Sequence, residues 1–321
     1  MNKPLRRPLS LGNLRAFEAV ARRLGFSAAA DEMFVTQSAV SRQIKALEDE
    51  LGAPLFVRGT RSVETTPDGQ ALLAVVSPWL ARLDAGVRQI RENRGRRRVS
   101  VTTFASFASL WLLPRIEAFQ SQHPDIDIRV SAQDAMAELE DPELDLALRY
   151  CTEAGAPRGA VRLFGEVLTP VASRGLVEQT RSGRAPPLAR PADLAGHTLA
   201  EEDDHRASSA SLSWRQWLAE QGEPALQPRS WLYLNYTYQQ VQAALAGHGI
   251  ALARMPLVFE ALQRGELVEP FGPQRRTAGP NSYWLVLPTS RKPREEVLQF
   301  CAWIEAQAAL TREAVGEKVT A

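Results

Sequence analysis

The sequence feature that most constrains the fold is a single long helical run at residues 67–92. Thr66 can cap this run, and Pro67 suits the first position of a helix. Its large apolar residues recur at steps of 3, 4, 3, 4 and 3: Leu73, Val76, Leu80, Leu83, Val87 and Ile90. This heptad spacing predicts a helix of about 39 Å that packs against a partner helix, most simply one from a second copy of the chain. Pro78 lies within the run, so we expect a kink there at a cost of about 3 kcal/mol.

Three short helices are predicted before the long one. The spacing of apolar residues predicts helices at 13–24 and 37–51, with a shorter one at 28–34 between them. We expect Ser27 to cap the second helix and Thr36 to cap the third. Short helices with tight links, the second and third almost touching, are typical of a helix-turn-helix.

The third predicted helix has two contrasting faces. At about 100° per residue its large apolar side chains form one stripe, and the opposite side is polar and basic. That polar side consists of Gln37, Ser38, Ser41, Arg42 and Lys45. The acidic residues come later, at the C-terminal end, where they would stay clear of phosphate. The face therefore fits a helix that enters the DNA major groove, and an ordinary solvated face is the alternative that the pattern alone leaves open.

A short hairpin is predicted next. Residues 55–66 read as two strands around Gly59 and Thr60, which is the pattern of a wing. Arg58 and Arg61 lie near its tip, where they would reach the phosphate backbone or an adjacent minor groove. The alternative is a turn that carries two exposed arginines.

Charge is distributed unevenly along the chain. Residues 1–98 hold 17 basic and 10 acidic residues, a net charge of +7, whereas residues 99–321 hold 21 and 27, a net charge of −6. The overall net charge of +1 hides this difference. A basic first third indicates contact with a polyanion, with chance asymmetry as the alternative.

After a basic, glycine-broken segment at 93–98, which we predict to be a hinge, strand-like and helix-like runs alternate. Strands are expected at 99–103, 126–131, 144–149, 167–172, 197–200, 231–234, 250–253 and 283–287. Helices are expected at 110–122, between 131 and 144, and at 176–180, 192–194, 212–220, 237–246, 257–263 and 294–310. This rhythm predicts a parallel sheet with helices on both faces, folded as two α/β lobes whose two crossings enclose a ligand cleft. The first lobe should comprise 99–170 and 276–310, and the second 171–275.

Several protein classes are excluded or disfavoured by the sequence. No signal-peptide pattern and no run of about 18 apolar residues appears, so we expect a soluble, cytoplasmic protein without a membrane role. Cys151 and Cys301 lie 150 residues apart, which favours packed free thiols over a redox pair. The HExxH, GxSxG and phosphate-loop motifs are missing, so no catalytic residue, metal site or cofactor is predicted. The segment Glu201–Arg206 fits an acidic solvated loop better than a metal cluster.

These motifs together resemble a known family. The segment from Leu11 to Gly69, above all TQSAVSRQIKALEDELGAPLF and TTPDGQ, is similar to the DNA-binding domain of LysR-type transcriptional regulators. LLPRIEAFQSQHPDIDIRV, LDLALRY, PADLAGHTL and AALAGHGIALARMPL resemble the rest of that family, in the branch with glycine-cleavage and β-lactamase regulators. The resemblance implies an α/β chain with a winged helix-turn-helix at 9–66, a dimerising linker helix at 67–92, a hinge at 93–98 and a two-lobed, periplasmic-binding-protein-like effector domain at 99–310.

The resemblance also implies how the protein acts. It implies a homotetramer that binds and bends promoter DNA, responds to a small-molecule effector and contacts RNA polymerase. It points to these DNA-contacting residues: Ser27, Thr36, Gln37, Ser38, Ser41, Arg42, Lys45, Arg58 and Arg61. Gln37 suits a bidentate contact with adenine, and Arg42 or Lys45 suits guanine or phosphate. Ser38 and Ser41 suit phosphate contacts that set the register.

Effectors in this family lie between the lobes, near the end of the first strand. The matching candidates here are Thr102, Thr103, Ser106, Arg149, Asn235, Tyr236 and Thr237. Ser106 and the segment 235–237 lie at predicted helix starts, where free backbone amides favour a carboxylate or an amino-acid-like anion. The alternative is that the hydroxyls are plain caps and that Arg149 is a surface arginine.

A ligand-binding α/β protein or an enzyme without a DNA role is the competing hypothesis for the whole chain. Residues 99–310 alone would suit a solute-binding protein, but the basic N-terminal part does not fit that class. Activators and repressors use the same residues, so the sequence leaves the sign of regulation open.

Overall fold

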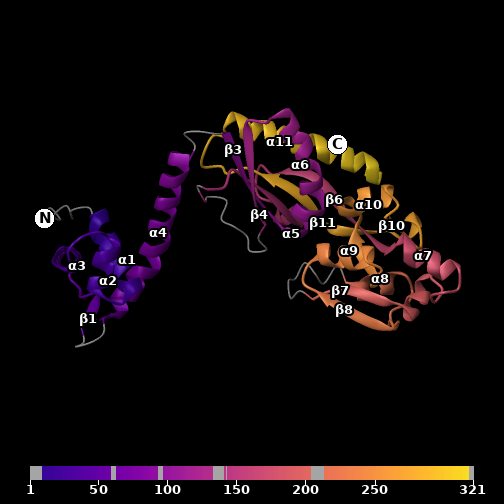
Figure 1. Ribbon diagram of the computed structural model, residues 1–321, viewed down its shortest axis with the longest axis horizontal. Helices are drawn as coiled ribbons and strands as arrows, with labels where there is room; N and C mark the ends of the chain where they lie inside the picture. The colour runs from indigo at the N-terminus through magenta and orange to yellow at the C-terminus, as the bar shows by residue number, and fades with distance from the viewer. Residues whose placement is uncertain are drawn as a thin grey trace. The chain divides into compact units, whose positions relative to one another are not determined.

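The computed structural model describes residues 9–58, 63–92, 97–132, 141, 143–203 and 213–317. The chain divides into two compact units, residues 1–92 and 93–321 (Figure 1). In the described residues, no helix is both long enough and apolar enough to span a membrane.

The first unit is helical with a small hairpin. Its elements are α1 (Leu11–Arg23), α2 (Phe26–Glu32), α3 (Gln37–Leu51), β1 (Phe56–Arg58), β2 (Val63–Thr65) and α4 (Pro67–Glu92). The predicted helices are confirmed, although α1 and α2 each begin two residues earlier than expected. The strands β1 and β2 pair antiparallel as the wing prediction requires. The tip between them lies outside the described residues.

The predicted cap of α2 is wrong. Gly25 is the N-cap residue, and Ser27 is the second residue of the helix. The helix begins at Phe26 because this ring is buried in the core, where it packs edge-on against Phe56 with ring centroids 6.0 Å apart. Burial of an aromatic side chain outweighs the preference of a serine for the cap position.

The second unit contains a nine-stranded sheet within the described residues. Its strands are β3 (Arg97–Thr103), β4 (Ile126–Ala132), β5 (Leu146–Thr152), β6 (Val161–Ser173), β7 (Thr198–Glu202), β8 (Ser230–Leu234), β9 (Ile250–Arg254), β10 (Leu267–Val268) and β11 (Thr277–Val286). The strand order is β4-β3-β5-β11-β6-β9-β7-β8, and β10 pairs with β6. Arg97 and Arg98 pair with β4, so the predicted hinge at 93–98 extends two residues too far.

The prediction of a parallel sheet is only half right. The strand β3 is parallel to β4 and β5, and β7 is parallel to β8 and β9. The centre is antiparallel, because β11 runs against β5 and β6, and β6 runs against β9. The long strand β6 pairs with β11 through residues 161–168 and with β9 through 168–171. It therefore carries the chain between the two halves, as the predicted crossing strand does.

Helices cover the sheet in both halves. They are α5 (Ala105–Phe107), the π-helical turn η1 (Ala108–Leu112), α6 (Leu113–Gln122), α7 (Arg174–Arg181), the 3-10 turn η3 (Pro191–Gly196), α8 (Trp214–Glu220), α9 (Thr237–Leu245), α10 (Met255–Gln263) and α11 (Glu295–Val315). Side chains of α6 and α11 fill one core with β3, β5 and β11. In the other half, α7 and α8 cover one face, and α9 and α10 cover the other (Figure 1). The helix expected between 131 and 144 falls largely outside the described residues.

Candidate functional site

The helix α3 presents the polar face that its sequence predicts. Gln37, Ser38, Arg42 and Lys45 are exposed, and Ser41 is half-buried. On the opposite side, Val40, Ile44 and Leu47 are completely buried. Core packing therefore fixes which side of α3 faces outward, and that side carries hydrogen-bonding groups and cations.

The start of α3 is well capped. The Thr36 hydroxyl accepts a hydrogen bond from the amide of Ala39 at 3.2 Å, so this predicted cap is confirmed. The Thr36 Oγ1 also lies 3.0 Å from the Ser38 Oγ. The Arg42 Nε donates to the Ser38 carbonyl oxygen at 3.4 Å. These contacts order the first two turns of the helix, where the predicted DNA contacts lie.

The acidic end of α3 supports the wing. The Glu48 Oε1 accepts hydrogen bonds from the amides of Leu55, at 2.7 Å, and Phe56, at 3.4 Å. This carboxylate therefore positions the first strand of the hairpin, a role that its place in an acidic run did not reveal. Of the predicted wing residues, Arg58 lies in β1, but its side chain and all of Arg61 fall outside the described structure.

The turn before α3 carries an unusual residue that the sequence reasoning missed. Phe34 has a φ of 55°, in the left-handed region that bulky side chains rarely adopt. Its side chain is 96% exposed. It precedes the Thr36 cap by two positions, so an exposed apolar residue lies just before the start of α3.

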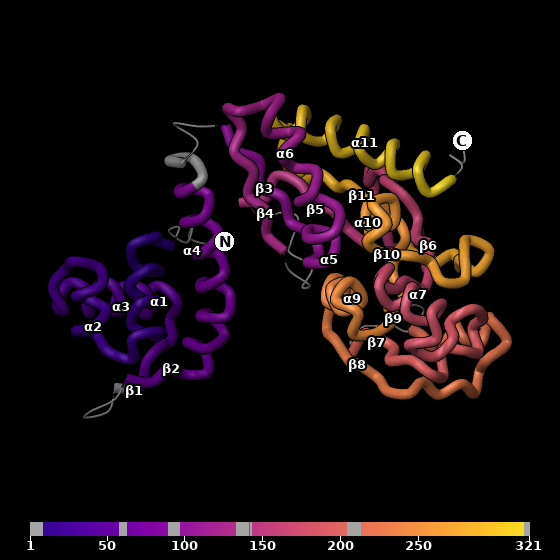
Figure 2. Tube along the Cα trace, turned by 45° about the vertical axis from the view of Figure 1, so that its right-hand side comes forward, coloured from indigo at the N-terminus to yellow at the C-terminus, as the bar shows by residue number. Residues whose placement is uncertain are grey.

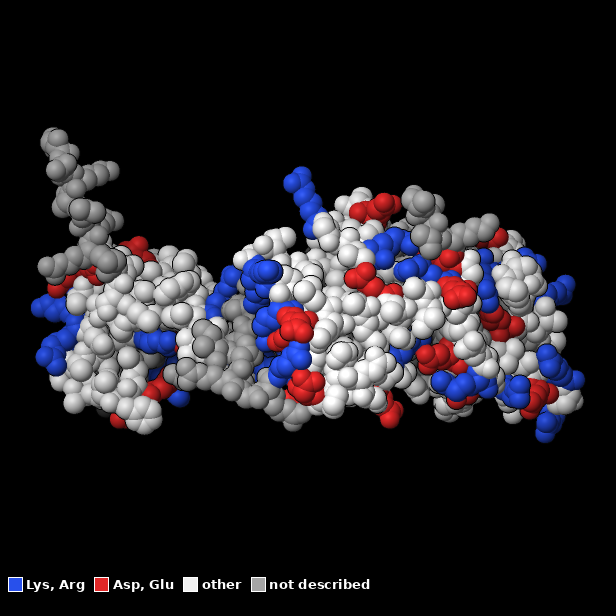
Figure 3. All heavy atoms as spheres, turned by 90° about the horizontal axis from the view of Figure 1, so that it is seen from above, with Lys and Arg blue, Asp and Glu red and all other residues white. Residues whose placement is uncertain are grey.

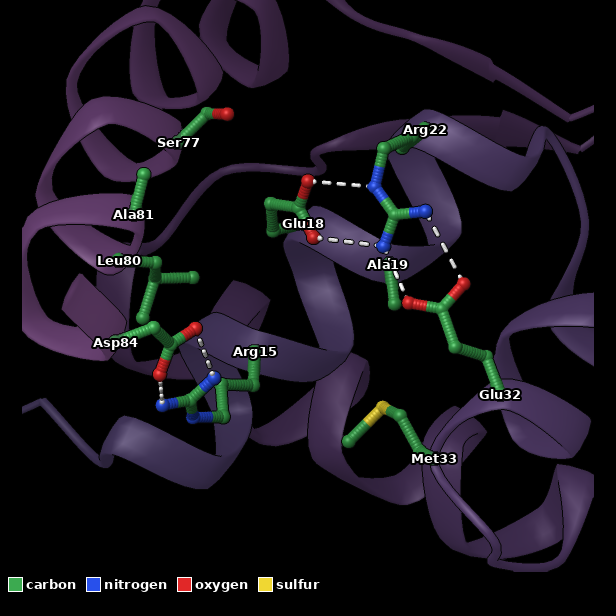
Figure 4. Close-up of a pocket in the computed structure, with 10 residues that line it drawn as sticks. All are labelled: Arg15, Glu18, Ala19, Arg22, Glu32, Met33, Ser77, Leu80, Ala81 and Asp84. Atoms are coloured by element: carbon green, nitrogen blue, oxygen red, sulfur yellow. Dashed lines mark hydrogen bonds and ion pairs between the residues drawn. The ribbon is translucent and has the colours of Figure 1, made fainter. Parts of the chain in front are cut away.

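Ion pairs join the helices of the first unit around a groove of about 520 Å³ between α1 and α4 (Figure 4). Arg15 of α1 binds Asp84 of α4, with one N–O distance of 3.0 Å. Arg22 pairs with Glu18 at 2.9 Å and with Glu32. Hydrogen bonds from Arg22 and Arg23 lower the pKa of Glu32 to about 2. The Arg15–Asp84 pair, with the buried side chain of Leu80, holds α4 against α1, and the pairs with Glu32 hold α2 against α1.

The apolar surface of α4 differs from the predicted heptad stripe. Val76 and Leu80 of that stripe are buried in the core of the first unit. Val87 of the stripe is 37% exposed, and the other exposed large apolar side chains described in α4 are Val75 and Trp79, which lie outside the stripe and are 69% and 49% exposed. Leu73, Val76 and Leu80, half of the predicted stripe, therefore pack within the first unit, whereas the prediction placed them against a second copy of the chain. The helix runs through Pro78 as one assigned element.

The second unit brings the predicted effector residue Ser106 against the first turn of α9, the helix that begins at the predicted residue Thr237. The Ser106 Oγ of α5 accepts a hydrogen bond from the amide of Tyr238, the second residue of α9, at 3.2 Å. The helices α5 and α9 lie side by side in both views (Figures 1 and 2). Ser106 is the second residue of α5, so it does not cap its own helix but binds the first turn of a helix from the other lobe.

Thr237 stands next to this contact. It is buried as the first residue of α9, and its hydroxyl donates to the Glu202 Oε2 at 3.2 Å while it accepts from Arg254. Tyr236 is half-buried at the N-cap position, and Asn235 is exposed. Three predicted residues therefore lie at the start of α9, and Thr237 is the one that is buried.

Thr102, Thr103 and Arg149 fall on different faces of the sheet. Thr102 of β3 lies beside Ala147 of β5, so their side chains point to the same face of the sheet. Arg149 comes two residues after Ala147 along β5, so Thr102 and Arg149 share that face. Thr103 lies on the other face. Arg149 is buried, and burial lowers its pKa, so it is not an ordinary surface arginine.

The two threonines retain binding capacity. Thr102 lines a small polar cavity of about 110 Å³ with Ser100, Arg129 and Ser131. Within the described structure, the buried hydroxyls of Thr102 and Thr103 have no hydrogen-bond partner. Burying a hydroxyl without a partner costs free energy. Both hydroxyls are therefore able to accept or donate a hydrogen bond to a bound molecule.

A buried ionic network was missed by the sequence reasoning. The Arg254 Nε lies 3.0 Å from the Glu166 Oε1, and its Nη2 lies 3.6 Å from the Glu202 Oε2. Glu202 lies at the end of β7 with Glu201, and both are half-buried, so the prediction of a solvated loop is wrong for these two residues. A signal was present, because single charged residues interrupt the apolar runs LFGEVL and IALAR.

Further features of the second unit are its potential metal-ligating groups, its buried cysteine and its surface charge. In the described part of the chain, no cluster of His, Cys, Asp or Glu is placed to hold a metal ion. Cys301 is buried, and burial raises the pKa of its thiol to about 12. On the face of the second unit seen in Figure 3, the described basic and acidic side chains intermingle without a patch of one sign.

A winged helix-turn-helix with a two-lobed α/β domain defines a class of DNA-binding regulators, and comparisons with known proteins agree. Residues 11–70 match the family described as "Bacterial regulatory helix-turn-helix protein, lysR family". Residues 92–309 match the "LysR substrate binding domain". The chain belongs to the LysR family of transcriptional regulators, with a DNA-binding domain followed by an effector-binding domain.

Curated relatives and solved structures support this placement. The chain is 33% identical to the glycine cleavage system transcriptional activator of Escherichia coli K12 over 303 residues, covering 94% of this chain and 95% of the relative. It is 34% identical to the transcriptional activator AmpR of Pseudomonas aeruginosa over 304 residues, covering 94% and 97%. The effector domain of that AmpR matches with a TM-score of 0.51 at 32% identity, covering 69% of this chain and 98% of that structure. Vibrio fischeri DarR, solved in complex with DNA, shares the fold with a TM-score of 0.62 at 20% identity, covering 94% of this chain and all of that structure.

Proposed function

We propose that this regulator reads its operator with the exposed face of α3 and grips the flanking phosphates with the wing. The carrying observation is the contrast within one helix: Val40, Ile44 and Leu47 are completely buried, and Gln37, Ser38, Arg42 and Lys45 face solvent. Gln37, in the first turn, suits a base edge, and Arg42 and Lys45 suit guanine or phosphate. Ser41 serves as a phosphate contact, and Thr36 orders this end of the helix as its cap. Ser27, exposed on α2, and the wing residues Arg58 and Arg61 complete the proposed surface.

A gel shift tests the DNA role directly. Purified full-length protein is titrated onto its own upstream intergenic DNA, with random competitor DNA, at two salt concentrations. Sequence-selective binding that weakens with salt is expected, because phosphate contacts release counterions. Binding to neither DNA at low salt would overturn the proposal and favour a ligand-binding or catalytic protein without a DNA role.

We propose that a small carboxylate or amino-acid-like anion binds between the lobes as the effector. The hydroxyls of Ser106 and Thr237 lie at the N-terminus of α9, and the unpartnered hydroxyl of Thr103 lies at the end of β3. Helix N-termini favour anions of this kind. Asn235 and Tyr236 flank the same turn, whereas Thr102 and Arg149 would reach an effector only from the other face of the sheet.

A thermal-shift screen tests the chemistry of the effector. Small amino acids and carboxylates are compared with their uncharged amides at equal concentrations. We expect melting-temperature increases with carboxylates alone, and a loss of that increase in Thr237→Val. Equal increases in melting temperature with acids and amides would refute an anion site. No increase with any acid would refute the proposal that the effector is a carboxylate.

We propose that the exposed apolar side of α4 forms the dimer interface with a second copy of this chain, and that dimers assemble into tetramers. Exposed apolar side chains at Val75, Trp79 and Val87, continuous with the buried stripe, favour helix-to-helix packing. Sedimentation of the wild type and of Trp79→Ala tests this, with Gln70→Ala, at an exposed position on another side of the same helix, as a control. Trp79→Ala should shift the mass towards smaller species, and an unchanged mass would refute the interface.

Contact with RNA polymerase is expected as well, and in vitro transcription with the bound promoter would test it.

A further inference from the structure

A buried network links strands from both lobes at one point of the second unit. Arg254 is almost completely buried at the end of β9, and its guanidinium binds Glu166 of β6 at 3.0 Å. It also lies over the ring of Tyr150 of β5, 5.1 Å from the ring centroid. The Tyr150 hydroxyl donates to the same Glu166 oxygen and accepts from the Asn281 amide of β11 at 3.1 Å. Side chains from four strands thus meet around one carboxylate.

The carboxylate fills an irregularity where the two long strands cross. Ala278 of β11 pairs with Val167, and Ser282 pairs with Gly165, so residues 279–281 lie opposite Glu166 alone. The Glu166 side chain is completely buried there. Its Oε2 would lie 2.0 Å from a Cβ atom added at Gly279, so any larger residue at position 279 would displace the carboxylate. Glu166 is therefore wedged into the bulge of the β6–β11 crossing.

The other side of Arg254 reaches the first turn of α9. Its Nη1 donates to the Thr237 hydroxyl, which donates in turn to Glu202 at 3.2 Å. The amide of the next residue, Tyr238, is the group bound by Ser106 of the first lobe. An unbroken series of contacts therefore runs from the strand crossing through Glu166, Arg254 and α9 to Ser106.

The members of this series cannot move independently. If Arg254 moves away, the buried Glu166 carboxylate is strongly destabilised because its charge loses its partner, and if Glu166 is lost, Arg254 keeps only Glu202, at 3.6 Å, as an anionic partner in the described structure. If α9 shifts, Arg254 must either release Thr237 or shift with it and pull on Glu166 in the bulge. A displacement at the cleft is thereby converted into a displacement at the crossing strands.

We propose that Arg254 is a positioning residue that couples the first turn of α9 to the β6–β11 crossing through its pair with Glu166. This inference rests on the proposed effector site between the lobes, because effector binding at that site is the event that the coupling would transmit. It adds to the proposed function two residues that need not touch the effector. Arg254 and Glu166 determine instead how strongly occupancy of the cleft acts on the strands that join the lobes.

Hydrogen exchange of the full-length protein, without any ligand, tests the coupling. Glu166→Gln lies in the bulge and makes no contact with α9 in the described contacts, and it keeps the shape of the side chain. We expect amide exchange in peptides covering residues 236–242 to become at least about tenfold faster, because a charge-assisted hydrogen bond is weakened. Arg254→Lys should do the same, because a lysine lacks the planar fork that spans Glu166 and Thr237.

A matched control comes from the same unit. Glu269 forms a bidentate pair with Arg276 at 2.8 and 2.7 Å and accepts from the Thr169 hydroxyl of β6 at 2.6 Å, and none of these contacts involves α9. Glu269→Gln should change local exchange and melting temperature without accelerating residues 236–242. If Glu166→Gln changes exchange only within β6 and β11, the coupling is refuted. If Glu166→Gln fails to fold, Arg254→Lys serves as the test. The coupling is then refuted if residues 236–242 exchange in Arg254→Lys at the wild-type rate. If instead the carboxylate screen fails while these shifts appear, the effector assignment falls and the coupling stands.

Discussion

The sharpest test of the DNA-binding surface is the substitution Gln37→Ala. Gln37 is exposed at the first position of α3, so its removal should leave the free energy of unfolding within about 0.5 kcal/mol. A bidentate contact between glutamine and adenine contributes about 2 kcal/mol of discrimination. The proposed symmetric dimer would make the contact twice, so its loss would cost about 4 kcal/mol of binding free energy, or roughly a thousandfold in Kd.

The assay compares variants on two DNAs. Fluorescence anisotropy gives Kd on the operator and on random DNA of equal length, at fixed salt, for the wild type, Gln37→Ala and Ser38→Ala. We expect Gln37→Ala to bind the operator roughly a thousandfold more weakly while it keeps most of its affinity for random DNA. Ser38→Ala, at the neighbouring position that we propose to contact phosphate, should weaken both by a similar factor. An equal loss on both DNAs for Gln37→Ala would show that this residue does not read sequence.

Three further substitutions test the structure of the first unit. Phe34→Asn should raise the free energy of unfolding by about 1 kcal/mol in urea melts, because asparagine tolerates the left-handed backbone at this position; a loss of stability would mean that the ring packs against something. Gly69→Ala should lower it by about 1–3 kcal/mol, since the added Cβ would lie 2.3 Å from the Leu55 carbonyl oxygen at the start of α4; a neutral result would refute that close approach. The hydrogen bond from Arg15 holds the pKa of Asp84 below its ordinary value of 3.8, so the pair stabilises the folded state at neutral pH and loses this contribution as the pH falls below that value. Asp84→Asn should therefore cost under about 1 kcal/mol at pH 7, because both side chains are partly exposed, and the difference from wild type should shrink towards pH 3; an equal difference at both pH values would contradict the linkage.

The helices of the first unit were predictable because local signals and burial agree. Thr36 lies before an apolar stripe of helical period, and the structure uses both. At α2 the two signals compete, and burial of Phe26 moves the start of the helix past Ser27. The long helix shows the same limit, since spacing alone does not say whether Val76 meets its own chain or another.

The sheet and the effector site were less predictable for a different reason. Alternation of strands and helices suggests parallel pairing, but the direction of β6 and β11 depends on where they cross between lobes, which no local pattern encodes. Glu166 and Arg254 are far apart in sequence and meet only because β6 pairs with β9. A charged residue inside an apolar strand indicates a buried partner, yet it does not identify that partner.

The two uses of α4 have a consequence for operator architecture. Val76 and Leu80 fix the helix to the fold that carries α3, and Val75 and Trp79 lie on the same turns facing outward. If these outward side chains meet their copies across a dyad, the separation of the two reading helices becomes a fixed length, with little freedom to adapt. The dimer would then bind only operators whose two half-sites are separated by one particular distance along the duplex. One residue inserted into α4 after Asp84 would rotate Val87 and the rest of the helix by about 100° and would leave the Arg15–Asp84 pair and the DNA-binding unit intact. A change in the preferred half-site spacing without a change in base preference would then separate the two roles of the helix.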